Sequence, residues 1–140
     1  MTTVKEIMTR ETKYITPHST IQEAAKLMTA ENIGFLPVGD NDRLVGSITD
    51  RDIVIRTLSN GKDTKTTTVK DAMTPKCLYC YESDTVEEAA NNMSTNKVRR
   101  LAVLNGNKRL VGVVTVGDLW TKSSPEDAAK VLKTITKKSH

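Results

Sequence analysis

The chain has 140 residues and a mass of 15.4 kDa; 37% of the residues are hydrophobic, 27% charged and 4% aromatic. This length fits one ordinary domain or two very small ones and excludes a multidomain enzyme. Because units much shorter than about 70 residues are marginal alone, any internal halves are expected to pack together.

The net charge of +4 does not mark a nucleic-acid binder. Acidic and basic residues alternate along most of the chain, and the concentrated basic stretch is the C-terminal end, with Lys130, Lys133, Lys137 and Lys138. Nucleic-acid binders usually show a denser basic stripe together with stacking aromatic residues. We therefore expect no nucleic-acid partner, although binding through the basic tail stays open as an alternative.

The sequence predicts a cytoplasmic protein without a membrane partner, a metal or a redox centre. No stretch approaches the roughly 20 apolar residues that cross a bilayer, and the N-terminus lacks an apolar signal-peptide region. Cys77 and Cys80 form a lone CxxC, which is half of a structural zinc site. We interpret both cysteines as strand residues.

The most informative feature is an internal repeat. Most of the first half recurs 65 positions later, and the last part recurs 66 positions later, after a one-residue insertion in a polar turn. The matching pairs are residues 4–9 with 69–74, 20–25 with 85–90, and 44–49 with 110–115. The repeat divides the chain into residues 1–61, residues 62–122 and a tail at 123–140.

In the first copy the pattern predicts a short strand at residues 13–15, then a helix. Ser19 with Gln22 forms the expected capping box, and the apolar spacing of residues 21–28 is helical. A hairpin of strands at residues 34–38 and 44–49 follows, and a second helix begins near Asp50.

The second copy repeats these elements. A strand is expected at residues 77–80, a helix after a capping box of Asp84 with Glu87, strands at 100–103 and 110–115, and a helix from Val116. Paired alanines in the first helix of each copy would let a sheet or second helix approach closely, and the methionines would fill the core.

Two further segments complete the chain. Residues 59–68 are polar and join the copies, either as a linker or as a loop that is ordered only by contacts. Ser124, Pro125, Glu126 and Asp127 predict a helix start, with Ser124 as the cap. We therefore expect a final helix in the tail.

The sequence predicts no catalysis by this chain. His18 precedes an expected helix start, and His140 is the last residue, so neither is placed to act as a general base. The glycines form neither a P-loop nor GxGxxG, and no HExxH or GxSxG is present.

Each copy ends in a strand that runs into a helix through a Thr-x-x-Asp turn. Thr49 with Asp52, and Thr115 with Asp118, have the spacing of a capping box that needs no ligand. The same turn also suits a nucleotide, since a helix N-terminus and a threonine hydroxyl attract phosphate while the carboxylate accepts the hydroxyls of a ribose. Both interpretations stay open at this stage.

The doubled pattern resembles the CBS domain, named after cystathionine β-synthase. The resemblance rests on the βαββα order, on Met-Thr at each start, on Leu36-Pro37-Val38, and on Gly-apolar-x-Thr-x-x-Asp at each end; it covers about residues 4–120. It implies an α/β (α+β) fold with two CBS motifs packed about a pseudo-twofold axis as a Bateman module, followed by a C-terminal helix. Members bind AMP, ADP, ATP or S-adenosylmethionine in clefts between the motifs, and no cofactor is obligatory.

The resemblance assigns roles by position. Asp52 and Asp118 would hold ribose hydroxyls, and Thr49 and Thr115 would approach ribose or phosphate. Basic candidates for phosphate, which could equally be solvated charges, are Arg51, Lys97, Arg99 and Arg100. Residues at positions where members contact adenine are Tyr14, Thr16 and Cys80.

The two copies differ where a ligand would bind. Ala102 stands at the position of Pro37, Gly34-Phe35 replaces Arg99-Arg100, and Val116-Gly117 replaces Asp50-Arg51. The two clefts are therefore expected to differ, and one alone could be occupied.

We expect a non-enzymatic regulator that senses an adenosyl ligand, forms a homodimer through helix faces, and signals to an unknown partner protein by changing shape. Residues 59–68 and the final helix are the expected moving parts. The alternative is a ligand-free dimerisation or interaction module whose Thr-x-x-Asp groups are only caps. CBS pairs also occur in IMP dehydrogenase, but this chain is too short for its catalytic barrel, which takes about 250 residues.

Overall fold

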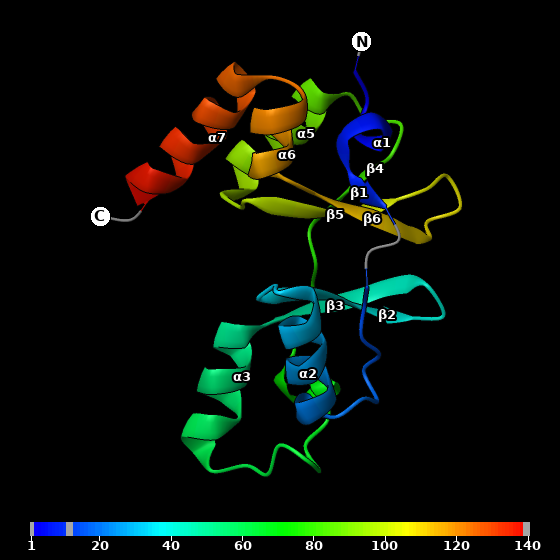
Figure 1. Ribbon diagram of the computed structural model, residues 1–140, viewed down its shortest axis with the longest axis vertical. Coiled ribbons are helices and arrows are strands. Elements are labelled where there is room, and N and C mark those ends of the chain that lie inside the picture. Colours follow the sequence, from blue (N-terminus) through cyan, green and yellow to red (C-terminus); the bar gives the residue numbers. More distant parts are fainter. Residues whose placement is uncertain (1, 11–12, 139–140) are drawn as a thin grey trace. The chain divides into compact units, whose positions relative to one another are not determined.

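The computed structural model describes residues 2–10 and 13–138, which form two compact units (Figure 1). The first-repeat unit is Lys13–Cys77; the second-repeat unit is Leu78–His140 together with Met1–Thr12. Each unit combines helices with a small sheet, so the expected mixed α+β class is confirmed. Within the described residues, no helix is long and apolar enough to cross a membrane.

The first-repeat unit is built on an antiparallel hairpin. Its elements are α2 (Ile21–Glu31), β2 (Phe35–Asp40), β3 (Arg43–Thr49), α3 (Asp50–Arg56), a 3-10 turn η1 (Leu58–Asn60) and α4 (Val69–Ala72). The turn between β2 and β3 places Asn41 and Asp42 at φ values of 53° and 66°, a backbone that asparagine and aspartate tolerate. The expected strand at residues 13–15 is reduced to one parallel bridge, between Ile15 and Val38.

The second-repeat unit has the same plan, but its sheet has four strands where the first-repeat unit has two. Its elements are α1 (Val4–Ile7), β1 (Thr9–Arg10), β4 (Tyr79–Tyr81), α5 (Val86–Asn96), β5 (Arg100–Leu104), β6 (Leu110–Thr115), α6 (Val116–Lys122) and α7 (Pro125–Lys138). The strand order is β1-β6-β5-β4, with only β4 and β5 parallel. The tail helix that the sequence predicts is α7, and the amide of Asp127 donates to its cap, Ser124 Oγ, at 3.2 Å.

The start of each repeat packs in the unit of the other repeat. Thr9, from the first copy, pairs with Val113 of the second; Thr74, from the second copy, forms a bridge with Ser47 of the first. Gly46 and Gly112 make these contacts possible, because a Cβ at either position would collide with the carbonyl oxygen of Thr74 or of Thr9. The Met-Thr and glycine motifs of the sequence therefore meet in space, each with the copy from the other repeat.

This exchange places residues 59–68 inside the first-repeat unit, so they do not connect the two units. The amides of Ile21 and Gln22 donate to the carbonyls of Thr67 and Thr64, both at 3.0 Å. The first amides of a helix have no partner within the helix, and this loop supplies partners for two of them. Of the two interpretations, the loop ordered by contacts is confirmed, while the chain passes between the units near residues 12–13 and 77–78.

The predicted capping boxes of the long helices are wrong by one residue. The caps are Thr20 with Glu23 and Thr85 with Glu88, in place of the expected Ser19 with Gln22 and Asp84 with Glu87. Thr20 forms a bridge with Thr68, and Thr85 with Thr3. This pairing holds both threonines in extended backbone, so each helix begins at the following residue.

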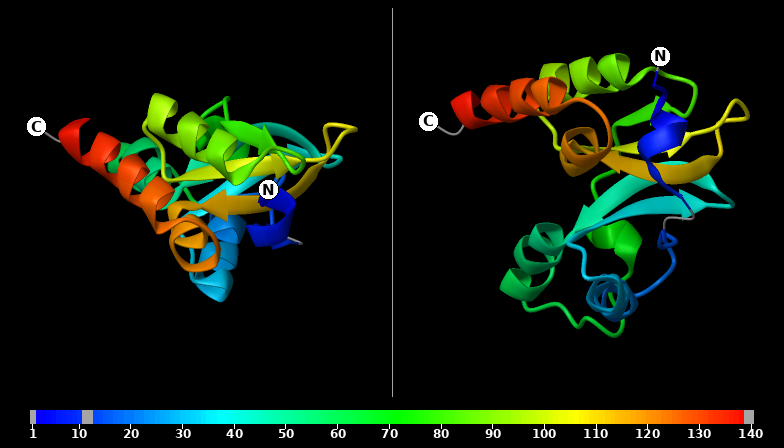
Figure 2. Two further views of the ribbon diagram at one scale, coloured as in Figure 1. Left: turned by 90° about the horizontal axis from the view of Figure 1, so that it is seen from above. Right: turned by 45° about the horizontal axis from the view of Figure 1, so that its top comes forward.

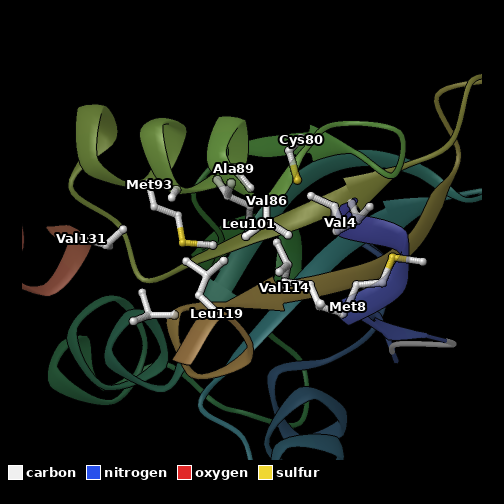
Figure 3. Close-up of a cluster of buried hydrophobic side chains, with 14 of the residues drawn as sticks. Val4, Met8, Cys80, Val86, Ala89, Met93, Leu101, Val114, Leu119 and Val131 are labelled. Carbon is white, nitrogen blue, oxygen red and sulfur yellow. The ribbon is translucent and has the colours of Figure 1, made fainter. Parts of the chain in front are cut away.

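Each unit has its own hydrophobic core. In the second-repeat unit, side chains from α1, α5, α6, α7 and the sheet converge, as Figure 3 shows for Met8, Met93, Leu101 and Leu119. The first-repeat core gathers around Ile21, Leu36, Ile48 and Val69. Met28 and Met93 are buried, which confirms the methionines as core residues.

Candidate functional site

The two Thr-x-x-Asp turns are capping boxes in the structure. Asp52 N donates to Thr49 Oγ1 at 3.1 Å, and Thr49 N donates to Asp52 Oδ2 at 2.9 Å. Thr115 and Asp118 repeat both bonds at the same distances. The capping interpretation is thus confirmed at both turns, and any ligand would use the remaining capacity of these carboxylates.

The second oxygen of each carboxylate faces a basic side chain one helical turn later. Asp118 Oδ1 lies 3.3 Å from Lys122 Nζ, and Asp52 Oδ1 lies 3.9 Å from Arg56 Nε. Asp118 is 9% exposed, and the side chain of Asp52 is also mostly buried. A carboxylate held by a cap and a neighbouring cation is fixed in position, which suits it to accept a pair of hydroxyl groups.

Basic residues adjoin the turn of the second-repeat unit. Lys97 is the C-cap of α5, with a left-handed φ of 56°, and the chain then runs through Arg99 into β5. The carbonyl of Arg99 accepts from Val116 N at 2.9 Å, and Arg100 pairs with Thr115 across the sheet. The side chains of Lys97, Arg99 and Arg100 are exposed. The structure therefore places the backbone of Arg99 and Arg100 beside the Thr115–Asp118 turn, with Lys97 two residues before Arg99 in the chain.

The equivalent turn of the first-repeat unit is less suited to an anion. Gly34 and Phe35 replace the two arginines, and Asp50 adds a carboxylate to that of Asp52. The amide of Arg51 donates to Asp50 Oδ1 at 2.9 Å. In α6 this bond has no counterpart, because Val116 replaces Asp50. The exposed Arg51 is the basic candidate at the first turn.

Tyr14 and Thr16 lie at the other end of the hairpin in the first-repeat unit. The hydroxyl of Tyr14 donates to Asp42 Oδ1 at 2.6 Å, and its ring covers Gly39, whereas Thr49 pairs with Phe35 at the opposite end of β2. The hydrogen bond to Asp42 raises the pKa of Tyr14. Thr16 Oγ1 lies 2.9 Å from Ser19 Oγ. Within this unit, the structure does not bring Tyr14 and Thr16 to the Thr49 turn.

Cys80 belongs to the core of the second-repeat unit. It lies on β4 beside Val103, is 2% exposed, and its burial raises the pKa of the thiol to about 12. Contact with a ligand would therefore involve the backbone of Cys80. Neither cysteine forms a disulfide bond, and the part of the chain that the structure describes contains no group of three or more metal-binding side chains. His140 lies outside the described residues.

One feature of the structure was missed in the sequence: a groove of about 440 Å³ between α2 and α3. The paired alanines are the sequence feature that bears on this groove, and the expectation that both pairs would be buried is wrong for the first repeat. Ala89 and Ala90 are both buried, as expected, whereas Ala24 is buried and Ala25 is exposed on the groove.

The sequence profile of the CBS domain matches residues 4–58 and again residues 69–119. The chain belongs to the CBS-domain family. It is 37% identical over 137 residues to the CBS domain-containing protein YhcV of Bacillus subtilis, covering 97% of this chain and 96% of YhcV. Hypoxic response protein 1 of Mycobacterium tuberculosis is 39% identical over 129 residues, covering 91% and 89%. This tandem CBS pair thus matches nearly the whole length of both relatives.

Solved CBS structures resemble the chain closely. The CBS domain protein TA0289 of Thermoplasma acidophilum has a TM-score of 0.78 at 26% identity, covering 94% of this chain and 75% of that one. CBSX2 in complex with AMP has a TM-score of 0.74 at 28% identity, covering 85% and 94%. The CBS pair of MJ0100, in complex with 5′-methylthioadenosine and S-adenosylmethionine, has a TM-score of 0.69 at 34% identity, covering 85% and 93%.

A match to an enzyme is confined to part of that enzyme. Inosine-5′-monophosphate dehydrogenase of Methanocaldococcus jannaschii is 34% identical over 126 residues, which are 89% of this CBS pair but only 24% of the dehydrogenase. The match therefore assigns no catalytic activity to this chain.

Proposed function

We propose that this CBS pair is a non-enzymatic regulatory module that binds an adenosyl ligand, either an adenine nucleotide or S-adenosylmethionine. The observation that carries the proposal is the pairing of Arg99 and Arg100 with the residues of the Thr115–Asp118 turn, just after Lys97 in the chain. Exposed cations beside a fixed carboxylate suit a molecule that carries phosphates on a sugar. Complexes of CBSX2 with AMP and of MJ0100 with S-adenosylmethionine support this ligand class.

Each residue has a distinct role in the proposal. Asp118 accepts the two ribose hydroxyls, and Thr115, Lys97, Arg99 and Arg100 approach the phosphates. Charge-assisted hydrogen bonds of this kind contribute about 1.5–3 kcal/mol each. In a second, weaker site, Asp52 and Thr49 act on the ribose with Arg51. Tyr14, Thr16 and the backbone of Cys80 enter as adenine contacts through the family resemblance.

The test is calorimetric titration of the purified protein, free of bound nucleotide, with AMP, ADP, ATP and S-adenosylmethionine. We expect a dissociation constant near the micromolar range, about −8 kcal/mol, for at least one of them. Asp118→Ala should weaken binding at least tenfold, and Asp52→Ala should weaken it less. Absence of heat with all four ligands would contradict the proposal.

A matched control separates ligand binding from helix capping. Glu88→Ala removes a capping carboxylate from α5 with the same geometry, but Glu88 belongs to no Thr-x-x-Asp turn at a strand end. Both variants lose a cap, which costs about 1 kcal/mol of stability. We expect only Asp118→Ala to lose ligand affinity. Equal losses in both variants would show that the effect is structural.

A second candidate function is favoured by the two capping boxes themselves. Because one oxygen of each aspartate is already used by the helix, the chain could be a ligand-free interaction module. Calorimetry without any heat, combined with partner binding that Asp118→Ala leaves unchanged, would support it. In either function we propose a homodimer, which sedimentation equilibrium would detect as about twice 15.4 kDa.

A further inference from the structure

One basic side chain in the second-repeat unit joins the aspartate of the Thr-x-x-Asp turn to a distant part of the chain. Lys122 Nζ lies 3.3 Å from Asp118 Oδ1 and donates to the carbonyl of Ile7 at 3.4 Å. Ile7 is the last residue of α1, which packs against α6 (Figure 2, dark blue and orange). A single ammonium group therefore connects residues that are 115 positions apart.

The first-repeat unit makes the same connection with an arginine. Arg56 Nε lies 3.9 Å from Asp52 Oδ1, while its Nη1 donates to the carbonyls of Met73 at 2.9 Å and Ala72 at 3.3 Å. Ala72 ends α4, which is the counterpart of α1 in the repeat. The two units thus form this bridge independently, with different basic residues.

The far end of each bridge is the C-terminus of a short helix that begins the other repeat. The last carbonyls of a helix have no partner within the helix, and a lysine or arginine can supply one. An ordinary ion pair on the surface of a helix would instead leave the cation in water and contribute little. In the second-repeat unit α1 leads into Thr9, which pairs with Val113 of β6. The bridge therefore links the Asp118 carboxylate to the segment that packs across the sheet.

The two bridges differ in how they respond to a change at the aspartate. One nitrogen of Lys122 makes both contacts, and both are long for hydrogen bonds. When Asp118 attracts the ammonium less, the ammonium can move toward the Ile7 carbonyl. In Arg56 separate nitrogens of a rigid guanidinium make the contacts, and the shorter carbonyl bond is already 2.9 Å. A change at Asp52 consequently has little effect on α4.

We propose that Lys122 is a positioning residue that transmits the state of Asp118 to α1, whereas Arg56 is a fixed clamp on α4. This inference rests on the adenosyl-binding function proposed above, because the ribose hydroxyls at Asp118 compete with Lys122 for the carboxylate. Ligand binding then strengthens the bond from Lys122 to Ile7 and stabilises α1 against local opening. An occupied site is thus reported at the first segment of the second-repeat unit.

The first test needs no ligand. Asp118→Asn removes the charge that attracts Lys122 but keeps an oxygen for the capping bond of α6, so it should imitate an occupied site. Hydrogen–deuterium exchange of residues 4–10, measured by mass spectrometry relative to α5, should slow at least about fivefold. Asp118→Asn should cause no slowing when it is added to Lys122→Met, which lacks the bridge, or to Lys122→Arg, which has the clamp of the first-repeat unit. The matched control is Asp52→Asn, which should leave exchange at residues 69–74 unchanged.

The second test uses AMP at a concentration that calorimetry shows to be saturating. AMP should slow exchange at residues 4–10 in wild type and not in Lys122→Arg, although calorimetry should show that both proteins bind it. Because the guanidinium keeps the charge and both contacts, this variant separates transmission from a merely structural role of the bridge. The α5 amides again serve as the internal reference.

Three results would overturn the inference. Exchange at residues 4–10 could be equal in wild type and Asp118→Asn. The slowing could persist when Lys122→Met or Lys122→Arg is also present, or AMP could bind wild type without slowing these amides. Slowing in Asp118→Asn that depends on Lys122, found together with no calorimetric heat, would support the transmitting role and contradict the proposed ligand alone.

Discussion

The two units share a hairpin with a helix before it and a helix after it, but they differ in what covers those helices. In the second-repeat unit α7 buries Ala90, Met93 and Leu119 completely or almost so. In the first-repeat unit the equivalent face is a groove in which Ile33 and Val54 remain exposed. The same supersecondary unit can therefore carry a closed and an open helix pair in one chain.

The difference extends to the strand-to-helix turns. The second-repeat turn has Arg99 and Arg100 close to Thr115, whereas the first has Gly34 and an additional carboxylate, Asp50. The closed unit thus has the more basic turn and the open unit the more acidic groove.

The largest effect is expected from removing an apolar side chain beneath α7. Leu119→Ala leaves a cavity in a covered core and should lower the free energy of unfolding by about 2–5 kcal/mol. Ile53→Ala changes the equivalent residue beside the open groove, where neighbours can relax, and should cost less. Urea denaturation measures both. An equal or larger loss for Ile53→Ala would contradict the covered–open distinction.

A smaller loss of stability is expected from adding a methyl group at Gly46 or Gly112, where the start of one repeat packs against a strand of the other. Gly112→Ala and Gly46→Ala would each force a backbone carbonyl to move, at a cost of about 1–3 kcal/mol by overpacking. Gly106→Ala is the control, because no heavy atom lies within 4 Å of its added Cβ. Thermal unfolding should separate the control from the other two. If all three variants unfold at the same temperature, the packing of Thr9 and Thr74 against the opposite repeat does not depend on Gly112 and Gly46.

Cys80 gives the second-repeat unit a pH dependence that Ile15, its counterpart, cannot give the other. Burial raises the pKa of the folded-state thiol to about 12, above its ordinary value of 9.0. The stability that the neutral thiol contributes is therefore present below about pH 9 and is lost as the pH rises toward 12. Cys80→Val should reduce this alkaline loss of stability. The check is urea denaturation between pH 8 and pH 11, and an identical alkaline slope in wild type and variant would contradict it.

The smallest effect is expected from the exposed capping carboxylates, and it should be the same in both units. Bonds from the backbone amide and hydroxyl of Thr20 lower the pKa of Glu23, and those of Thr85 lower the pKa of Glu88. The stability they contribute is present above about pH 4.5 and is lost as the pH falls. Glu23→Gln and Glu88→Gln should each slightly reduce the loss of unfolding free energy between about pH 5 and pH 3, as urea denaturation would measure it. A change in one variant only would show that the two helix starts differ.

Local patterns predicted most of the fold because local chemistry determines it. The hairpins, the helices after Thr49 and Thr115, and the Ser124 cap all depend on residues within a few positions of one another. The one-residue error at Thr20 and Thr85 has a non-local cause. Pairing with Thr68 and Thr3 holds those residues extended, and no window around the helix shows this.

The candidate site divides in the same way. The sequence identified both Thr-x-x-Asp turns and the Lys97–Arg100 stretch, but their meeting in one unit depends on the pairing of β5 with β6. It also placed Tyr14 among ligand contacts, whereas the structure bonds its hydroxyl to Asp42 at the far end of the hairpin from Thr49. The ligand roles of these residues stay predictions until the titrations are made.

The sequence by itself determined the duplicated βαββα plan, the family, and the residues that cap each helix at a strand end, because periodicity and capping act over short distances. Only the tertiary structure decided which copy of the Met-Thr segment packs on which sheet, and which helix pair is covered. These choices depend on contacts between residues about a hundred positions apart, such as Thr9 with Val113, where identical local patterns could pair in either way. Packing at Gly46 and Gly112 fixes which Met-Thr segment lies on which sheet. Because α7 follows α6 in the chain, it covers the helices of the second-repeat unit.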